Sequence, residues 1–319
     1  MSTIQYHSEP QLRNPIIIAA FAGWNDAADA ATTAVKFLID KWKPTKVAEI
    51  DPEEFFIFTE TRPTIKLSNG IQRSIVWPSS NFFAYELPEE ERDILLYIGV
   101  EPQLKWKTFT NTFLEVCKHF NVSETILMGA LLADVPHSIT VPISGSSPDD
   151  GLKERLQEMD VLQSRYEGPT GIIGILQEAN RRASIPVASL WASTPHYLAA
   201  TPNIKVTAAL LTYLNTFLSL GLDLNELQND AVHFEEQITA LVARDPEASA
   251  YVRKLEEQLR EDDEDDDDND NDNEEAEDEA PKINTGPLPS AEALIRGVEE
   301  LLRQERHNGS PLDSDEDEE

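Results

Sequence analysis

A short, unbroken apolar run near the N-terminus constrains the fold of this chain more than any other feature. Ile16–Phe21 contains six consecutive apolar residues, which is typical of a strand buried on both faces. Asp26, a good helix N-cap, follows within one short loop, and apolar positions then recur with the helical period until Pro44. The pattern therefore predicts a strand, a loop and a helix in that order.

Further strands and helices alternate along the next 150 positions. Strand patterns fall at Val47–Ile50, Ile94–Ile98, Thr125–Ala130 and Pro186–Trp191, and helical patterns at Trp106–Phe120 and Gly171–Ser184. Such alternation is typical of a parallel sheet covered by helices. We therefore predict a three-layer α/β body over residues 1–221, with a mixed, mostly parallel sheet.

One stretch predicts an antiparallel portion. Asn69-Gly70, the strongest short hairpin signal, lies between the strand-like segments Thr64–Ser68 and Ile71–Trp77.

From Lys205 the pattern is helical throughout, first in an apolar helix that ends near Gly221. Apolar residues from Leu224 to Leu241 then follow a narrow 3-4-3-4-3 spacing, which favours packing against other helices. Asp245-Pro246 interrupts the pattern before a second helical arm. We predict a helical hairpin over residues 222–260, which either packs on the α/β body or contacts another subunit.

Acidic residues dominate the C-terminal part of the chain. The formal net charge is −33, and Asp and Glu supply 15 of residues 261–280 and 6 of residues 311–319. These stretches predict an acidic disordered linker over 261–289 and an acidic disordered tail over 308–319. Between them, residues 290–307 predict an amphipathic helix, which either docks on the body or binds a protein partner.

The charge and the N-terminal sequence also exclude several classes of protein. A strongly negative chain repels phosphate backbones and anionic lipid, so we expect no nucleic-acid or membrane binding. The first residues lack a signal-peptide pattern, and no apolar run approaches the length of a membrane span. Cys117, the single cysteine, fits a core thiol on a helix. We therefore expect a soluble cytoplasmic protein.

Candidate ligand-binding residues come from topology, because the standard nucleotide, hydrolase and zinc motifs are absent. Ligands of open α/β sheets bind beyond the carboxyl ends of the parallel strands. Polar residues follow four of the predicted strands. Gly171 begins a predicted helix whose first N–H groups suit an anion, or else serves only a tight entry from loop to helix. The candidates are Asn25, Asp26, Glu101, His137, Gly171, Ser193, His196 and Tyr197.

Each candidate has a structural alternative. A carboxylate beside an imidazole suits general acid–base chemistry. Asp26, however, also suits a helix cap, and His137 and His196, each beside a proline, also suit hydrogen bonding in rigid turns. Two histidines some sixty residues apart do not define a metal site. We therefore predict neither a metal nor a cofactor, and assign no catalytic residue.

Five stretches, in order, resemble the proteasome assembly chaperone 2 family in its bacterial branch. They are Phe21-Ala22-Gly23-Trp24-Asn25-Asp26-Ala27, Tyr97-Ile98-Gly99-Val100-Glu101-Pro102 with Trp106, Gly129-Ala130-Leu131 leading to Val135-Pro136-His137, Tyr166-Glu167-Gly168-Pro169-Thr170-Gly171 and Leu190-Trp191-Ala192-Ser193-Thr194-Pro195-His196-Tyr197. The resemblance runs from about Asn14 to Arg260, and Ser290–Arg306 also resembles the C-terminal helix of that branch.

The resemblance implies a phosphorylase/hydrolase-like α/β fold with a helical C-terminal part, and a homo-oligomer, for which we expect a trimer. The resemblance implies that some eukaryotic and archaeal relatives dock on a proteasome ring through a C-terminal hydrophobic–tyrosine–any tail, whereas this sequence ends Asp317-Glu318-Glu319, so we do not expect docking by that route. The family pattern also places Thr-Arg-Pro after the Pro-His pair, whereas Ser138-Ile139-Thr140 stands here.

Two hypotheses follow. The first is an oligomeric assembly or interaction protein without catalysis. The alternative is a small-molecule hydrolase or phosphorylase-like enzyme with its site at the strand ends.

Overall fold

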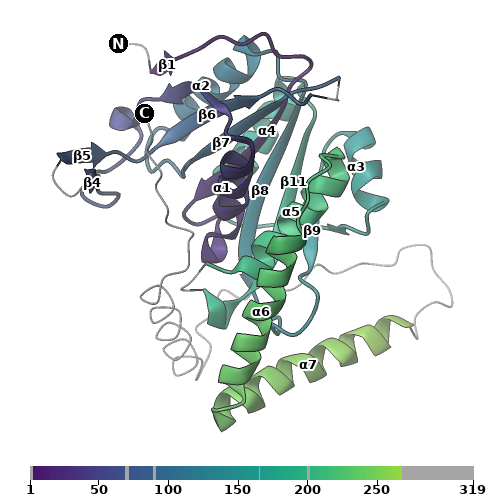
Figure 1. Cartoon of the computed structure of the whole chain (residues 1–319). Helices are drawn as coiled ribbons and strands as arrows, with labels where there is room; N and C mark the ends of the chain where they lie inside the picture. The colour runs from purple at the N-terminus through teal and green to yellow at the C-terminus, as the bar shows by residue number, and fades with distance from the viewer. Residues whose placement is uncertain (1–2, 69–71, 89–90, 165, 200–201, 268–319) are drawn as a thin grey trace.

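The computed structural model describes residues 3–68, 72–88, 91–164, 166–199 and 202–267. Its centre is a nine-stranded sheet with helices on both faces (Figure 1). In spatial order the strands are β1 (Ile4–Tyr6), β3 (Thr45–Ile50), β6 (Ser80–Tyr85), β7 (Ile94–Val100), β2 (Ile16–Ala22), β8 (Glu124–Ala133), β11 (Val187–Pro195), β9 (Ile143–Ser146) and β10 (Leu162–Gln163). The predicted three-layer α/β fold with a mixed sheet is confirmed.

The middle of the sheet is parallel. Strands β7, β2, β8 and β11 all run in one direction, so their carboxyl ends lie along one edge. Antiparallel pairings flank this centre on both sides, between β6 and β7 and between β11 and β9. The sheet therefore has one edge at which four connecting loops meet, as the topological argument requires.

Side chains of β2 alternate between the two faces of the sheet. Ile16, Ile18 and Ala20 pack with α1 (Ala30–Trp42), α3 (Asp150–Gln157) and α5 (Ile204–Leu218). Ile17, Ala19 and Phe21 pack with α2 (Trp106–His119) and α4 (Ile172–Arg182). Burial on both faces explains why this strand is continuously apolar.

The sulfur of Cys117 lies in the second of these cores. Burial raises the pKa of its thiol, so the side chain behaves as an apolar core residue, as predicted.

The C-terminal helices pack partly on the body, through Leu227 and Ala231 in the first core, and partly on each other at its end (Figure 1). Phe234, Ile238 and Val242 of α6 (Asn225–Val242) pack with Val252 and Leu255 of α7 (Pro246–Asp267), and both helices contact Tyr197 and Leu198. The inner face of the predicted hairpin is therefore covered by this chain itself.

Helix α7 continues to Asp267, into the segment that we expected to be linker from residue 261. Glu247–Asp267 contains no Gly or Pro that would end a helix. The remainder of the predicted linker, the 290–307 helix and the 308–319 tail lie outside the described residues.

The predicted β-hairpin forms from β4 (Thr64–Ser68) and β5 (Gln72–Val76), and among the described strands these two pair only with each other. It projects from the body beside the sheet (Figure 1), while the antiparallel parts of the main sheet come from other strands. None of the helices in the described ranges is long and apolar enough to cross a membrane.

Candidate functional site

Six of the eight candidate residues fall into two groups, each held by its own hydrogen bonds, and Asp26 and Ser193 lie outside both. One group, at the ends of β2 and β7 and the start of α4, contains Asn25, Glu101 and Gly171. The other, between β8, β11 and the C-terminal helices, contains His137, His196 and Tyr197. Glu101 and the two imidazoles therefore have different hydrogen-bond partners.

Asn25, Glu101 and the first turn of α4 form the first group. The Asn25 amide, which is fully buried, donates from Nδ2 to Glu101 Oε1 over 2.7 Å. The same carboxylate oxygen accepts the backbone N–H of Ile172, the first residue of α4, over 2.8 Å. A carboxylate is thus already bound at this helix N-terminus, where an anion is stabilised by the helix dipole.

Gly171 allows this arrangement because it has no side chain. A Cβ atom at this position would lie 2.1 Å from Asn25 Oδ1, well inside van der Waals contact. Oδ1 itself is buried and has no hydrogen-bond partner among the described residues. The group therefore contains one acceptor that a donor from outside would satisfy.

Asp26 caps α1, although the helix begins later than predicted. A short 3-10 turn, Ala27–Asp29, precedes it, because Ala28 and Asp29 have left-handed backbone conformations. The Asp26 carboxylate accepts the N–H of Ala31 over 2.7 Å and the N–H and hydroxyl of Thr32. Burial raises the pKa of this carboxyl to about 6, against the opposing effect of its hydrogen bonds.

His137 and Tyr197 are joined by two hydrogen bonds. The Tyr197 hydroxyl accepts the backbone N–H of His137 over 2.7 Å and lies 2.8 Å from its Nδ1. On the other side of the ring, Nε2 lies 3.2 Å from Thr239 Oγ1 of α6. The ring therefore connects the end of the body to α6. Burial, followed by the nearby Lys205 ammonium, lowers the pKa of His137 to about 4.

His196 makes the corresponding connection to α7. Its Nε2 lies 3.1 Å from the Tyr251 hydroxyl, and its Nδ1 lies 3.3 Å from Asp134 Oδ1. Burial lowers the pKa of His196, with Asp134 acting in the opposite direction. Both imidazoles therefore contact the C-terminal helices, and burial lowers the pKa of each.

Sequence reasoning missed Lys205 and Glu235, which complete this junction. Lys205 Nζ donates to the carbonyl oxygens of His137 and Ile139, over 2.5 and 2.7 Å, and pairs with Glu235 at 2.6 Å. A single cation in the otherwise apolar α5 was the available signal, since a lysine at such a position needs buried partners.

Ser193 lies beside this junction and is almost fully buried. Its backbone N–H donates to the Pro142 carbonyl over 3.0 Å. The cavity that Ser193, His137 and Lys205 help to line measures about 10 Å³, room for at most a single water molecule. Within the described ranges, no three His, Cys, Asp or Glu side chains are grouped so that they could hold a metal ion.

Comparison with known proteins places this fold in a family. The PAC2 family model matches residues 20–242, which include both hydrogen-bonded groups. A PAC2 family protein from Streptomyces avermitilis has a crystal structure with 40% sequence identity and a TM-score of 0.68, and the match covers 75% of this chain and 99% of that one. The chain therefore belongs to the PAC2 family, and the resemblance seen in its sequence is confirmed.

Two further solved structures are informative. A proteasome-assembly chaperone homologue from Mycobacterium tuberculosis is 38% identical, with a TM-score of 0.67 over 74% of this chain and 99% of that one. PbaB of Pyrococcus furiosus, an archaeal proteasome activator, is 18% identical, with a TM-score of 0.60 over 75% of this chain and 98% of that one, and shares the fold. No curated protein matches the chain.

Proposed function

We propose that this chain is an oligomeric assembly or interaction protein of the cytoplasm that works without catalysis. The proposal rests on one observation, that the polar side chains at the strand ends make contacts within the protein. His137 and His196 hold the C-terminal helices, Asp26 caps α1, and Glu101 binds the start of α4. These groups serve internal contacts, while the helical hairpin that they position extends beyond the body as a surface for other proteins.

The family supports the same role. A relative 38% identical to this chain is described as a proteasome-assembly chaperone homologue. Assembly chaperones work by presenting surfaces, so family membership favours protein contacts over substrate turnover. We propose a homo-oligomer, with a trimer favoured, and a protein partner bound through the helical extension.

Native mass spectrometry of the protein purified gently from its own cells tests this proposal. We expect a closed oligomer of three 35.8 kDa subunits, either alone or with a protein partner. A monomer without partners at every concentration would contradict an oligomeric assembly role.

Deletion variants examine the C-terminal residues beyond the described ranges. Removing 308–319 should leave the subunit count and partner capture unchanged, whereas removing 290–319 should alter one of them. If the longer deletion changes neither, the 290–307 segment is not a contact surface.

A small-molecule enzyme of hydrolase or phosphorylase type is the second candidate, and one observation favours it. Asn25 Oδ1 is buried without a partner beside Glu101 and the start of α4. A ligand with an N–H or O–H donor would satisfy this oxygen. The candidate predicts a co-purifying small molecule in the native mass spectrum, which the Glu101→Gln variant should lose. Unchanged mass in both proteins would count against it.

A further inference from the structure

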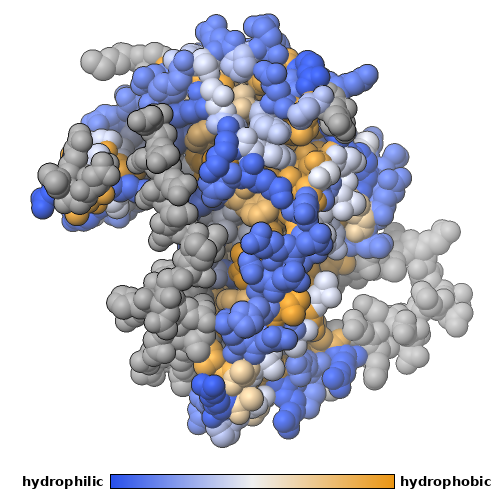
Figure 2. All heavy atoms as spheres, viewed as in Figure 1, coloured by the Kyte–Doolittle hydropathy of each residue, from blue (hydrophilic) through white to orange (hydrophobic). Residues whose placement is uncertain are grey.

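The β4–β5 ribbon, which we call the arm, presents an apolar face to solvent. Ile65 pairs directly with Ile75, and Leu67 with Arg73, so these four side chains share one face. Ile65, Ile75 and Leu67 are 63%, 61% and 59% exposed. Figure 2 shows hydrophobic surface on this projection among hydrophilic residues.

Among the described residues, the arm contacts the body at its base. Trp77 directly follows β5, and its ring meets the Phe58 ring edge to face with centroids 4.9 Å apart. Beyond this contact, neither strand packs substantially on another described helix or strand. An isolated two-stranded ribbon is marginally stable in water, so an exposed apolar face on one indicates a surface that a partner covers.

Charge identifies the kind of partner. Residues 61–85 contain Arg62, Lys66 and Arg73 and no Asp or Glu, within a chain whose net charge is −33. The arm is therefore a basic apolar element on an acidic protein, and a second copy of the chain supplies acidic surface. Two arms packed against each other would bring like charges together, so the complementary contact joins an arm to a different surface of the next copy.

Helix α6 offers such a surface. Besides Glu235, which pairs with Lys205 of the same subunit, it contains Glu226, Asp230 and Glu236 and neither Lys nor Arg. Val232 is 59% exposed on its outer side, and Glu236 lies one turn further along on the same side. The arm and α6 project from different parts of the molecule (Figure 1). An apolar residue beside a carboxylate on α6 thus complements Ile65, Ile75 and Arg73 on the arm.

We propose that the arm of one subunit packs on α6 of the next copy, with Ile65 and Ile75 against Val232 and Arg73 beside Glu236. Such a head-to-tail contact uses two different surfaces of each subunit, and it forms a ring where the rotation closes. The inference rests on the proposed homo-oligomer and names the surfaces that build it.

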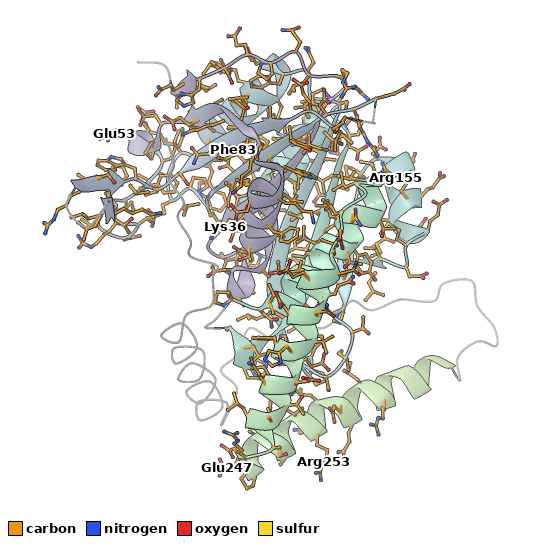
Figure 3. All side chains as sticks on the ribbon, viewed as in Figure 1. Lys36, Glu53, Phe83, Arg155, Glu247 and Arg253 are labelled. Carbon is orange, nitrogen blue, oxygen red and sulfur yellow. The ribbon has the colours of Figure 1, made fainter. Side chains whose placement is uncertain are left out.

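A charge swap tests the contact, with subunit count measured by native mass spectrometry and light scattering. Arg73→Glu and Glu236→Arg should each weaken association at least about tenfold, because each places like charges together. The double variant should regain the wild-type mass. Lys36→Glu on α1 and Glu154→Arg on α3 are matched controls, since both side chains are exposed and lie on other helices (Lys36 in Figure 3). Ile75→Ser should dissociate the oligomer without restoration by Glu236→Arg.

The outcomes separate this inference from the proposed function. A wild-type oligomer that keeps its mass in both single variants would overturn the arm-to-α6 contact and leave an oligomeric role standing. Dissociation by both single variants without recovery in the double variant would overturn the pairing of Arg73 with Glu236. A wild-type monomer at all concentrations would overturn both the contact and the homo-oligomer. Circular dichroism spectra that match wild type show that each variant is folded.

Discussion

Thr239, acting with Tyr197, sets the tautomer of His137. The Thr239 hydroxyl donates its proton to the Glu235 carbonyl, so Oγ1 accepts from the ring Nε2–H, 3.2 Å away. Nδ1 then carries no proton and accepts from the Tyr197 hydroxyl, 2.8 Å away. The Tyr197 oxygen also accepts the backbone N–H of His137. One series of hydrogen bonds thus runs from Tyr197, just beyond the end of β11, through the imidazole into α6.

Removing the Tyr197 hydroxyl should break this series of hydrogen bonds at its first member. We expect Tyr197→Phe to lower the free energy of unfolding by about 1–3 kcal/mol, because a buried N–H and a ring nitrogen lose their partner. Urea unfolding measures the change. Tyr251→Phe is the matched control, since its half-buried hydroxyl makes a single 3.1 Å contact with His196 and should cost less. Equal losses would contradict the central role of Tyr197.

Protonation of His137 should destabilise the fold at acid pH. Its pKa of about 4 lies below the ordinary value of 6.5, so the unfolded chain binds this proton first. The stability that the neutral ring contributes is present above pH 6.5 and is lost as the pH falls toward 4. The stability gap between wild type and His137→Gln should therefore narrow by up to about 3 kcal/mol over this range. A gap independent of pH would show that the pKa is not lowered.

The stability that Asp26 contributes should depend on pH in the opposite direction to that of His137. The Asp26 pKa of about 6 lies above the ordinary 3.8, so its contribution is greatest at low pH and declines as the pH rises through this window. At pH 7 Asp26→Ala should still cost about 1–2 kcal/mol, because the first N–H groups of α1 lose their acceptor. Asp26→Asn, which keeps one oxygen, should cost less. Thermal unfolding of both variants distinguishes a cap from a residue without structural role.

A methyl group at Gly171 should disrupt the Asn25 amide. Gly171→Ala should destabilise the protein by about 1–3 kcal/mol, because its Cβ would lie 2.1 Å from Asn25 Oδ1. Gly151→Ala on α3 is the control, since its Cβ would meet nothing closer than 3.5 Å, and it should be neutral or stabilising. Adding Asn25→Ala to Gly171→Ala should cost less than the sum of the two changes. Strict additivity would mean that the two residues do not clash.

The elements of the sheet could be predicted where the local pattern carried the information. Ile16–Phe21 is buried on both faces, and its continuous apolar run indicates this directly. Strand β6 was missed because its residues, Ser-Asn-Phe-Phe-Ala-Tyr, show no alternation of polar and apolar types, although their burial alternates in the structure. The start of α1 was placed too early, because nothing local indicates left-handed conformations at Ala28 and Asp29.

The sequence indicates which polar residues lie at the strand ends, but not which residues they contact. The argument from strand ends places Asn25 near Glu101, and the two side chains are hydrogen-bonded because β2 and β7 are parallel neighbours. The contact of His137 with Thr239 spans 102 positions, and its formation depends on where α6 packs. No sequence spacing encodes that placement, and a lone cation on α5 indicates only that Lys205 needs buried partners, without identifying them.

The hydrophobic cluster that holds α7 is separate from the two cores of the body and meets the body at Tyr197 and Leu198, whereas the first half of α6 packs in the first core through Leu227 and Ala231. Helix α7, held by this small cluster and by the contact of Tyr251 with His196, therefore has its own opening equilibrium, separate from global unfolding. Backbone amides in α7, between Glu247 at the tip and Arg253 further along (Figure 3), should therefore exchange with deuterium well before those of β2 or β8. We therefore expect two classes of amide exchange rate in this chain. The faster class reports the opening of α7, which can occur while the sheet remains folded.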